Sequence, residues 1–332
     1  MTRSKRQMNL RSAAAVLLAA LALLVSQAPR LDAQALPAAP LPAGEIGGLD
    51  NDAARWDTPH CEIEAQKVEC GESGIGYSGP AQESTTVPSG DGAALRGGLI
   101  SGPSYPAVMY RRRLSDAPQA AFARAYELDF RFLYRPESTF NNEGVPSRVQ
   151  AVEFAVSAWR SEPSDGLFRV YDWELQFLNV RSDPSLSPLW RLWTGQGGAW
   201  ESVGVTEVPA RLAADKWHHV TLRAEAASGV PGITGGWAAR YVSFTIDGVT
   251  YPIHRDVQPM IREYQPEMVA NVLLQLDGPA NINTVGGYEV LLDDVTVRWY
   301  DNPPWTNDCP ALPADAALLF GGLRHFQHRG RV

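Results

Sequence analysis

Hydrophobic and polar residues alternate with a period of two over long parts of the chain, which is typical of extended strands. The clearest case is the run 170–180, where aromatic and aliphatic residues occupy the odd positions from 171 to 177. Asp172, Glu174 and Gln176 occupy the even positions between them. A strand of this kind buries one side and presents a polar side, so the segment is predicted to lie in a half-buried sheet.

Short runs of the same kind recur along the chain and are separated by Gly, Pro, Asn and Asp. Short helical turns are expected only at 118–126 and 209–214, and the chain shows neither βαβ spacing nor a repeat of fixed length. The pattern therefore predicts an all-β sandwich, in which two antiparallel sheets stack around one core. Its strands are expected at 106–113, 126–135, 149–159, 170–180, 189–194, 200–205, 217–225, 240–247, 250–254, 268–277 and 288–299, with a hairpin turn at Asp247-Gly248.

The first 33 residues have the composition of a secretory signal peptide. A basic stretch ending at Arg11 precedes the apolar run 13–25, which is shorter than the ~20 residues that a membrane-spanning helix needs. Small residues at Ala33 and Ala35 suit cleavage near Gln34, and an uncleaved signal anchor is the alternative. The protein is therefore expected to be secreted or extracytoplasmic, without membrane insertion after the leader is removed.

The net charge of the chain argues against some classes of binding partner. The chain has 37 Asp and Glu against 29 Lys and Arg, and its formal net charge is −8. The leader holds more basic than acidic residues, so its removal makes the chain more acidic still. A negative surface repels phosphate backbones and anionic lipids. No nucleic acid and no membrane surface is therefore expected as a partner.

Three segments carry a resemblance to a known family: DKWHHVTLR from Asp215, YVSFTIDGV from Tyr241 and LLDDVTVRW from Leu291. They resemble strand signatures of the concanavalin A-like lectin/glucanase superfamily, which includes laminin-G-like domains and family 16 glycoside hydrolases. The resemblance covers roughly residues 120–300. It implies a two-sheet antiparallel jelly-roll sandwich whose concave face often binds glycans.

The domain organisation follows from this fold and from local composition. Residues 34–55 are rich in Pro, Ala, Leu and Gly and are expected to form a flexible lead-in. Residues 56–305 are expected to form a single jelly-roll domain, with a loop-rich N-terminal part at 71–104 that is rich in Gly, Ser and Pro. Residues 306–332 are expected to be a C-terminal tail, after the signal peptide 1–33 and the domain.

Residues that suit sugar binding fall on the polar faces of the predicted strands. Carboxylates and amides form hydrogen bonds with sugar hydroxyls, and aromatic rings stack on the C–H faces of sugars. An ordinary outer sheet face, where polar residues also lie, is the alternative. The candidate ligand-binding residues are Glu153, Trp159, Asp172, Glu174, Gln176, Arg191, Trp193, Asn271, Gln275 and Asp277.

The segment from Asp172 to Gln176 resembles the acid-bearing strand of the family 16 hydrolases. The resemblance implies Asp172 and Glu174 as catalytic acids in an enzymatic alternative. Carboxylates at i and i+2 lie ~6.6 Å apart on a strand, which is within the separations used for glycoside hydrolysis. However, Gln176 stands where the family has its acid/base, and a carboxamide cannot protonate a leaving oxygen.

The same resemblance implies a metal ligand in the last predicted strand. Asp293 matches the acidic residue of the family's last strand, which implies a structural Ca²⁺ at this position. A hard cation takes ~6–8 oxygen ligands, and the sequence identifies only this one. An Asp with an ordinary structural role at this point of the strand is the alternative, and no other cofactor is expected.

The chain has 3 Cys, an odd number, so at most one intrachain disulfide forms. Cys61 and Cys70 are separated by a segment long enough for a small hairpin, and this pairing is favoured. The alternative is a bridge from Cys309 to one of the pair, because the resemblance implies a fold that usually lays the N-terminal strand beside the last one.

These features favour a secreted, non-catalytic carbohydrate-binding or adhesion protein whose partner is a glycan or a cell-surface polysaccharide. The alternative is a glycan-cleaving enzyme of the same superfamily, either a hydrolase or a lyase, and the sequence leaves open whether the chain is an enzyme. A lyase would need Tyr and Arg, for which Tyr171, Arg160 and Arg191 are available. A structural envelope protein without a ligand is the third hypothesis.

Overall fold

A computed structural model describes most of the chain that was predicted to form the domain. These residues belong to one compact unit, and its elements are strands and short 3-10 turns. No helix in the described part of the chain is long and apolar enough to cross a membrane. The predicted signal peptide 1–33 and tail 306–332 lie outside the described residues. The described residues are 41–63, 66–70, 74–85, 88, 91–103, 105–136, 151–178, 189–203, 212–213, 215–263, 267–278, 287–303 and 305.

The first sheet, sheet A, consists of β1 (Gly44–Ile46), β5 (Gly76–Ser84), β6 (Ala93–Ser101), β8 (Ala125–Pro136), β13 (His218–Ser228), β14 (Trp237–Ile246), β15 (Val249–Val257) and β18 (Tyr288–Tyr300). Neighbouring strands follow the order β15–β14–β13–β8–β18–β6–β5, and β1 pairs with β18. Every pairing in this sheet is antiparallel.

The second sheet, sheet B, consists of β2 (Trp56–Asp57), β3 (Cys61–Ile63), β4 (Gln66–Val68), β7 (Pro106–Arg113), β9 (Ala151–Ser161), β10 (Phe168–Leu178), β11 (Leu189–Trp193), β12 (Trp200–Ser202), β16 (Met260–Arg262) and β17 (Val269–Asp277). Its order is β12–β11–β10–β9–β17–β7–β3–β4, with β16 on β10 and β2 on β7. Its pairings are also antiparallel.

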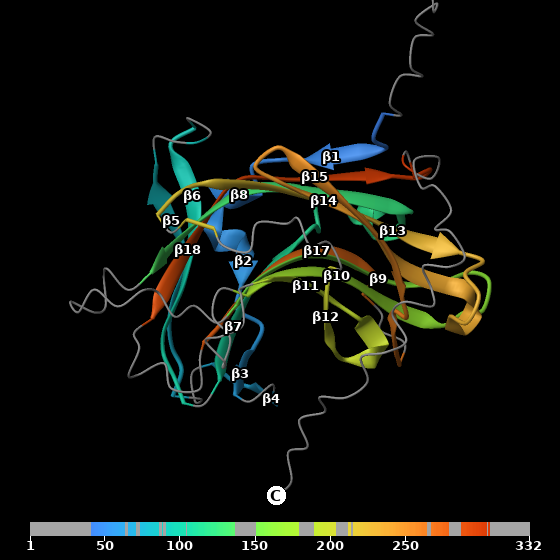
Figure 1. The fold of residues 1–332 in the computed structure, drawn as a ribbon, viewed down its shortest axis with the longest axis horizontal. Coiled ribbons are helices and arrows are strands. Elements are labelled where there is room, and N and C mark those ends of the chain that lie inside the picture. The colour runs from blue at the N-terminus through green and yellow to red at the C-terminus, as the bar shows by residue number, and fades with distance from the viewer. Residues whose placement is uncertain are drawn as a thin grey trace, which may run out of the picture. The chain divides into compact units, whose positions relative to one another are not determined.

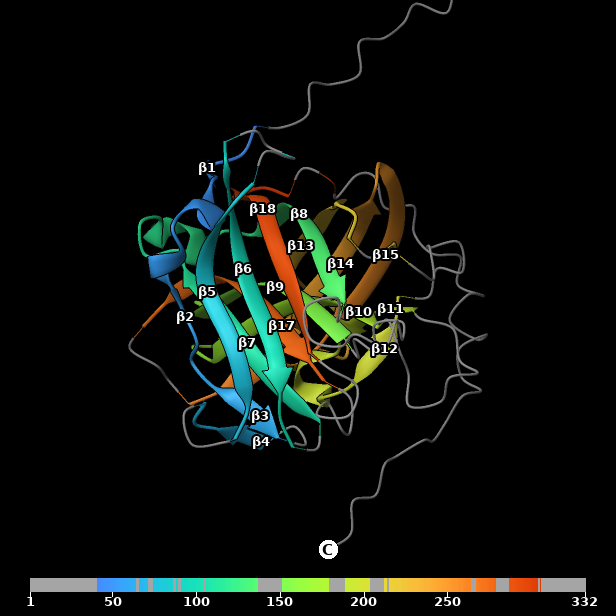
Figure 2. The same cartoon turned by 90° about the vertical axis from the view of Figure 1, so that its left-hand side faces the viewer.

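The two sheets lie face to face as two layers (Figure 1). Sheet B is arched: β17, β9 and β10 lie nearest to sheet A, whereas β3 and β4 at one side and β12 at the other lie further from it (Figure 1). Its concave face therefore points away from sheet A. Figure 2 shows β5 and β6 beside β18 at one end of sheet A. This architecture is the predicted two-sheet antiparallel jelly-roll sandwich.

The core lies between the two sheets and is filled by the apolar side of each strand. In β10, Tyr171, Trp173 and Leu175 are fully buried, as their alternation predicted. The ring of Trp173 lies 5.1 Å from that of Tyr126 in β8, and this contact joins sheet B to sheet A. Because one side of β10 is committed to the core, its even-numbered residues must face the concave side.

Tyrosine hydroxyl groups cross the core and hold the backbone of the opposite sheet. Tyr241 of β14 accepts the N–H of Glu174 at 3.0 Å and lies 2.9 Å from the carbonyl oxygen of Trp193, at the junction of β10 and β11. Tyr288 of β18 donates to the carbonyl oxygen of Ala151 at 2.7 Å. These contacts satisfy buried backbone groups directly behind the concave face.

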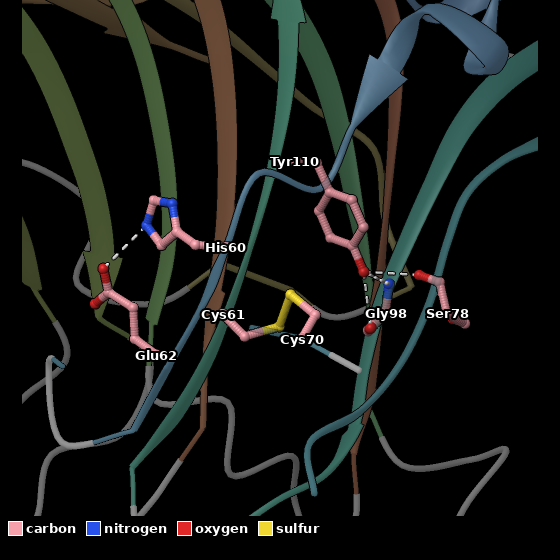
Figure 3. The surroundings of a disulfide bond; sticks show 7 residues. All are labelled: His60, Cys61, Glu62, Cys70, Ser78, Gly98 and Tyr110. Carbon is pink, nitrogen blue, oxygen red and sulfur yellow. Dashed lines mark hydrogen bonds and ion pairs between the residues drawn. A yellow bond between two sulfur atoms is a disulfide. The ribbon is translucent and has the colours of Figure 1, made fainter. Parts of the chain in front are cut away.

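Two segments expected to lack regular structure contain strands instead. In the predicted flexible lead-in 34–55, the described residues from 41 onward include β1 and two 3-10 turns, η1 (Leu49–Asn51) and η2 (Ala53–Arg55). The predicted loop-rich stretch 71–104 contains β5 and β6. The glycines of β6 reflect close packing, because a Cβ on Gly97 would lie 2.7 Å from the ring of Tyr110. The hydroxyl of Tyr110 in turn donates to the carbonyl oxygen of Ser78 at 2.7 Å (Figure 3).

Local turn signals predicted the structure better than the composition of these two segments did. The hairpin between β14 and β15 turns at Asp247-Gly248, as predicted, and both residues have positive φ values of 48° and 84°. The expected helical turn at 118–126 is a short 3-10 turn, η3 (Pro118–Phe122). The other expected turn, 209–214, falls mostly outside the described residues.

Candidate functional site

Gln176 is the centre of a hydrogen-bonded network on the concave face of sheet B. Strand register places it between Glu153 of β9 and Arg191 of β11. Its Nε2 donates to Glu153 Oε1 and, at 3.4 Å, to Asp277 Oδ2, while its Oε1 accepts from Arg191 Nε at 2.7 Å. Gln275 Nε2 adds a hydrogen bond to Asp277 Oδ1 at 3.1 Å. Because both ends of the Gln176 amide are engaged, the orientation of the network is defined.

A second row of polar residues crosses the same face at Asp172. The strand register aligns Asp172 of β10 with Ser157 of β9 and Asn271 of β17. Asn271 Nδ2 donates to Ser157 Oγ at 3.2 Å, and Ser157 forms a hydrogen bond that lowers the pKa of Asp172. The hydroxyl of Ser157 therefore donates to Asp172 and accepts from Asn271. This direction leaves Asn271 Oδ1, which is buried, without a hydrogen-bond partner.

Burial raises the pKa values of four carboxyl groups on this face, and it is the largest cause in each case. The pKa of Asp172 rises to about 6, and those of Glu153 and Glu174 rise well above the usual range. The charge of Asp277 adds to the rise in the pKa of Glu153, and that of Asp172 adds to the rise in the pKa of Glu174. Carboxyl groups whose pKa values are raised by burial and by nearby charges are typical of binding and catalytic sites.

Aromatic rings lie at one edge of the network. The rings of Trp193 and Trp200 are 5.3 Å apart, and the guanidinium carbon of Arg191 lies 5.7 Å from the centre of the Trp200 ring. Trp159 is placed elsewhere on the face, because its strand register aligns it with Val170 near the opposite end of β10. The structure therefore gathers the predicted polar residues and Trp193, and leaves Trp159 apart from the network.

Two residues of this site were not among the sequence candidates. Ser157 links Asp172 to Asn271, but a serine on the polar face of a strand carries no signal that distinguishes it from its neighbours. Trp200 lies in β12, a strand of only 3 residues, which is too short for an alternation to be read.

The structure places the hydrolase candidates and the lyase candidates Tyr171 and Arg160 on different faces of sheet B. Asp172 and Glu174 face the same side of β10, as the hydrolase hypothesis requires. The lyase candidates Tyr171 and Arg160 do not reach the concave face. Both are buried and bind Glu162, whose Oε1 accepts from the Tyr171 hydroxyl at 2.7 Å and from Arg160 Nε at 2.7 Å. A lyase reaction on the concave face thus has no support from these two residues.

A separate acidic cluster surrounds the metal candidate Asp293. Carboxylate oxygens of Asp50 in η1, Asp91 before β6 and Asp293 in β18 all lie within 4.8 Å of one another. Asp50 and Asp293 are fully buried, and Asp50 Oδ2 has no hydrogen-bond partner. Burial, together with the charges of Asp293 and Asp91, raises the pKa of Asp50 to about 7. Such a set of carboxylate oxygens fits a hard cation such as Ca²⁺.

Cys61 and Cys70 are joined by a disulfide across the β3–β4 hairpin, with their Cα atoms 4.9 Å apart (Figure 3). This is the pairing that the sequence favoured, and Cys309 lies outside the described residues. The same hairpin carries Glu62, whose Oε1 lies 3.2 Å from Nε2 of His60 (Figure 3). The disulfide thus stabilises one edge of sheet B, next to its concave face.

Comparisons with known proteins give matches among solved structures only. No family model and no curated protein matches the chain. The structure of alginate lyase Aly36B matches with a TM-score of 0.40 at 12% identity, over 67% of this chain and 88% of that one. Alginate lyase vAL-1 from Chlorella virus matches with a TM-score of 0.40 at 8% identity, over 69% and 94%. The carbohydrate-binding module TmCBM27, described in connection with mannan recognition, matches with a TM-score of 0.29 at 10% identity, over 78% and 97%. Matches at these identities and TM-scores assign no activity to this chain.

Proposed function

We propose that this chain is a non-catalytic carbohydrate-binding protein that holds a glycan on the concave face of sheet B. The observation that carries the proposal is the buried polar network around Gln176, with the row from Asn271 to Asp172 beside it. Sugar hydroxyls donate and accept hydrogen bonds, and this face offers carboxylates, amides and a guanidinium group on adjacent strands. Trp193 and Trp200 add rings on which a sugar stacks.

Burial separates this face from an ordinary outer sheet face. The polar side chains of an ordinary face extend into water, but Glu153 is only 6% exposed, and Gln176 and Asn271 are each 1% exposed. Replacing a buried, hydrogen-bonded polar network by well-packed apolar residues of similar volume is often neutral or stabilising, so the stability of the sheet does not require these groups. A binding function explains why the chain carries these groups here.

Glycoside hydrolysis is the second candidate function. The specific observation in its favour is that Asp172 and Glu174 share one face and that both have raised pKa values. Against it, the next residue on this face is Gln176, whose carboxamide cannot protonate a leaving oxygen. A structural envelope protein without a ligand is the third possibility that the experiment below distinguishes.

Glycan binding without turnover is the expected result when one preparation is tested on a glycan array and in a reducing-end release assay. Replacing Glu174 with Gln is expected to weaken binding by about tenfold or more, because the carboxyl group that binds the sugar is replaced by a carboxamide with a different set of donors and acceptors. The control is Glu45→Gln, which removes one carboxylate from the outer face of sheet A and is expected to leave binding unchanged.

Other outcomes of this experiment reject the proposal. Release of reducing ends that disappears in Glu174→Gln identifies a hydrolase. Absence of both binding and release favours the structural hypothesis. Equal binding by the two variants shows that the glycan lies elsewhere.

The proposed site of action is outside the cytoplasmic membrane, on a glycan or cell-surface polysaccharide. The leader-like composition of residues 1–33 supports export. The Cys61–Cys70 disulfide also supports it, because disulfides persist in oxidising compartments.

The cluster of Asp50, Asp91 and Asp293 is proposed to hold a structural Ca²⁺. The three residues come from the N-terminal segment, the approach to β6 and the last strand, so a bound cation would fasten these segments together. Its charge would offset the carboxylates, of which two are buried, and would remove the need for Asp50 to retain a proton.

Calcium is expected to raise the unfolding temperature at about pH 8, with a gain of about 2.7 kcal/mol at a hundredfold excess over Kd. Without the cation, Asp50 keeps its proton up to about pH 7 in the folded chain but only to about pH 4 when unfolded. The folded state then binds more protons in this window, so stability falls as pH rises from about 4 to about 7.

The measurement is thermal unfolding with Ca²⁺ or with a chelator, from about pH 4 to about pH 8. Asp50→Asn is expected to lose both the calcium response and the fall in stability with pH. An unfolding temperature that ignores Ca²⁺ in the wild type, or a response that persists in Asp50→Asn, contradicts the metal site.

A further inference from the structure

Acidic groups outnumber basic ones among the titratable residues that face the site. Arg111 and Arg113 on β7 are already paired, with Asp57 at 2.6 Å and Glu267 at 2.5 Å. His60 beside the site is paired with Glu62. The acids that face the site are Glu62 of β3, Glu153 of β9, Asp172 and Glu174 of β10 and Asp277 of β17, and the bases are Lys67 of β4, Arg191 of β11 and Arg262 of β16.

The basic residues offset the negative charge of these acids only in part. Arg191 donates to the neutral amide of Gln176, and Lys67 is exposed on a short edge strand. Lys67 lowers the pKa values of Asp172 and Glu174, but burial outweighs it and both pKa values remain raised. The centre of the face is therefore short of positive charge.

The face also holds a buried acceptor that lacks a donor. In the row from Asn271 through Ser157 to Asp172, one N–H of Asn271 Nδ2 and the hydroxyl of Ser157 donate within the row. Asn271 Oδ1 then remains as a buried acceptor without a partner, on a side chain that is 1% exposed. Buried acceptors of this kind are rare, because each costs free energy until a donor arrives. A ligand that brings a donor to Asn271 Oδ1 and positive charge to the acids would therefore complement the face.

We infer that the glycan bound on the concave face is an amino-sugar glycan, with an ammonium group between Asp172 and Glu174 and a further sugar donor on Asn271 Oδ1. The inference rests on the proposed function, and it names the class of sugar. An ammonium has three donors and no acceptor, and it supplies the missing charge at the same position. A uronate glycan would instead add carboxylates to a face that already holds an excess of them.

Binding of such a sugar has a proton balance of its own. A carboxylic acid that retains its proton in the free protein loses it when an ammonium group arrives, and the carboxylate–ammonium pair forms while the proton passes to the solvent. The raised pKa values of Asp172 and Glu174 support this exchange. Proton release is therefore a signature that a neutral sugar does not share.

The test is isothermal titration calorimetry at about pH 6, where a sugar amine is protonated and Asp172, with a pKa of about 6, is about half protonated. Buffers of different ionisation enthalpy report the protons released. The ligands are three oligosaccharides of equal length: one of glucosamine, its N-acetylated counterpart and one of mannuronate. The glucosamine oligosaccharide is expected to bind at least about tenfold more tightly than the others, with release of protons.

Variants assign the effect to residues. Asp172→Asn is expected to remove most of the preference for the amine and most of the proton release, and Asn271→Leu is expected to weaken all binding. Glu45→Gln, which removes one carboxylate from the other sheet, is expected to leave both quantities unchanged. Each variant is first shown by its unfolding curve to be folded.

Failure of the inference and failure of the proposed function give different results. Tighter binding of the N-acetylated sugar or the mannuronate, or glucosamine binding without proton release, overturns the amino-sugar assignment and leaves a carbohydrate-binding protein. Absence of binding to every glycan rejects the proposed function, and the inference with it.

Discussion

Replacing Trp173 with Ala is expected to lower the free energy of unfolding by about 3–5 kcal/mol. Trp173 is 0% exposed, and its ring lies 5.1 Å from that of Tyr126 in sheet A and 5.5 Å from that of Tyr171. Its removal deletes buried apolar surface and leaves a large cavity between the two sheets, which surrounding side chains fill only in part. Urea denaturation followed by fluorescence or circular dichroism gives the value.

The matched control is the next residue on the same strand. Glu174→Ala changes the concave side of β10 and is expected to change the stability by less than about 1 kcal/mol. The contrast between adjacent residues tests the alternation that underlies the whole fold. Similar losses in the two variants would show that β10 does not bury one face only.

Gln176→Leu is expected to lower the free energy of unfolding by about 2–4 kcal/mol. Leucine is apolar and one atom shorter than glutamine, so it neither donates to Glu153 and Asp277 nor accepts from Arg191. Glu153, which is buried, then loses the amide that donates to it, and a buried carboxyl group left short of a donor costs more free energy than one hydrogen bond gains.

Gln275→Leu is the control for this prediction, since it makes the same substitution in the same row of sheet B. Gln275 is half-buried and donates to Asp277 at 3.1 Å, so its loss is expected to cost less than about 1 kcal/mol. If both variants keep the stability of the wild type, Gln176 does not organise the face.

The sequence was most informative where strands alternate without interruption. β7 begins and ends at the predicted residues, and β9, β10 and β17 match their predicted ranges to within a few residues. Their polar faces could be assigned because a buried strand face must be apolar, and one shift of register would expose it.

What the sequence could not supply is which strands are neighbours. Placing β9 between β10 and β17 is what brings Ser157 between Asp172 and Asn271, and no local pattern encodes that pairing. The lyase candidate Tyr171 shows the opposite case. Its odd position on β10 already assigned it to the core, and the structure places it there.

The strands β5 and β6, which contain many small residues, were not predicted from the sequence. β5 and β6 are rich in Gly and Ser, which favour loops in general, but here Gly97 makes room for the ring of Tyr110. The acidic cluster was incomplete for a different reason. Asp293 was identified through a family resemblance, whereas Asp50 and Asp91 reach it only through the tertiary fold, from segments distant in sequence.

The central claim is that a glycan binds on the concave face of sheet B. The most direct test is a crystal structure of the protein with a bound oligosaccharide. The account predicts polar atoms of the sugar within about 3.2 Å of Asp172, Glu174 and Asn271 Oδ1, with Gln176 still bound to Glu153 and Arg191. A sugar found on the outer face of sheet A, or one that touches none of these three residues, would contradict it.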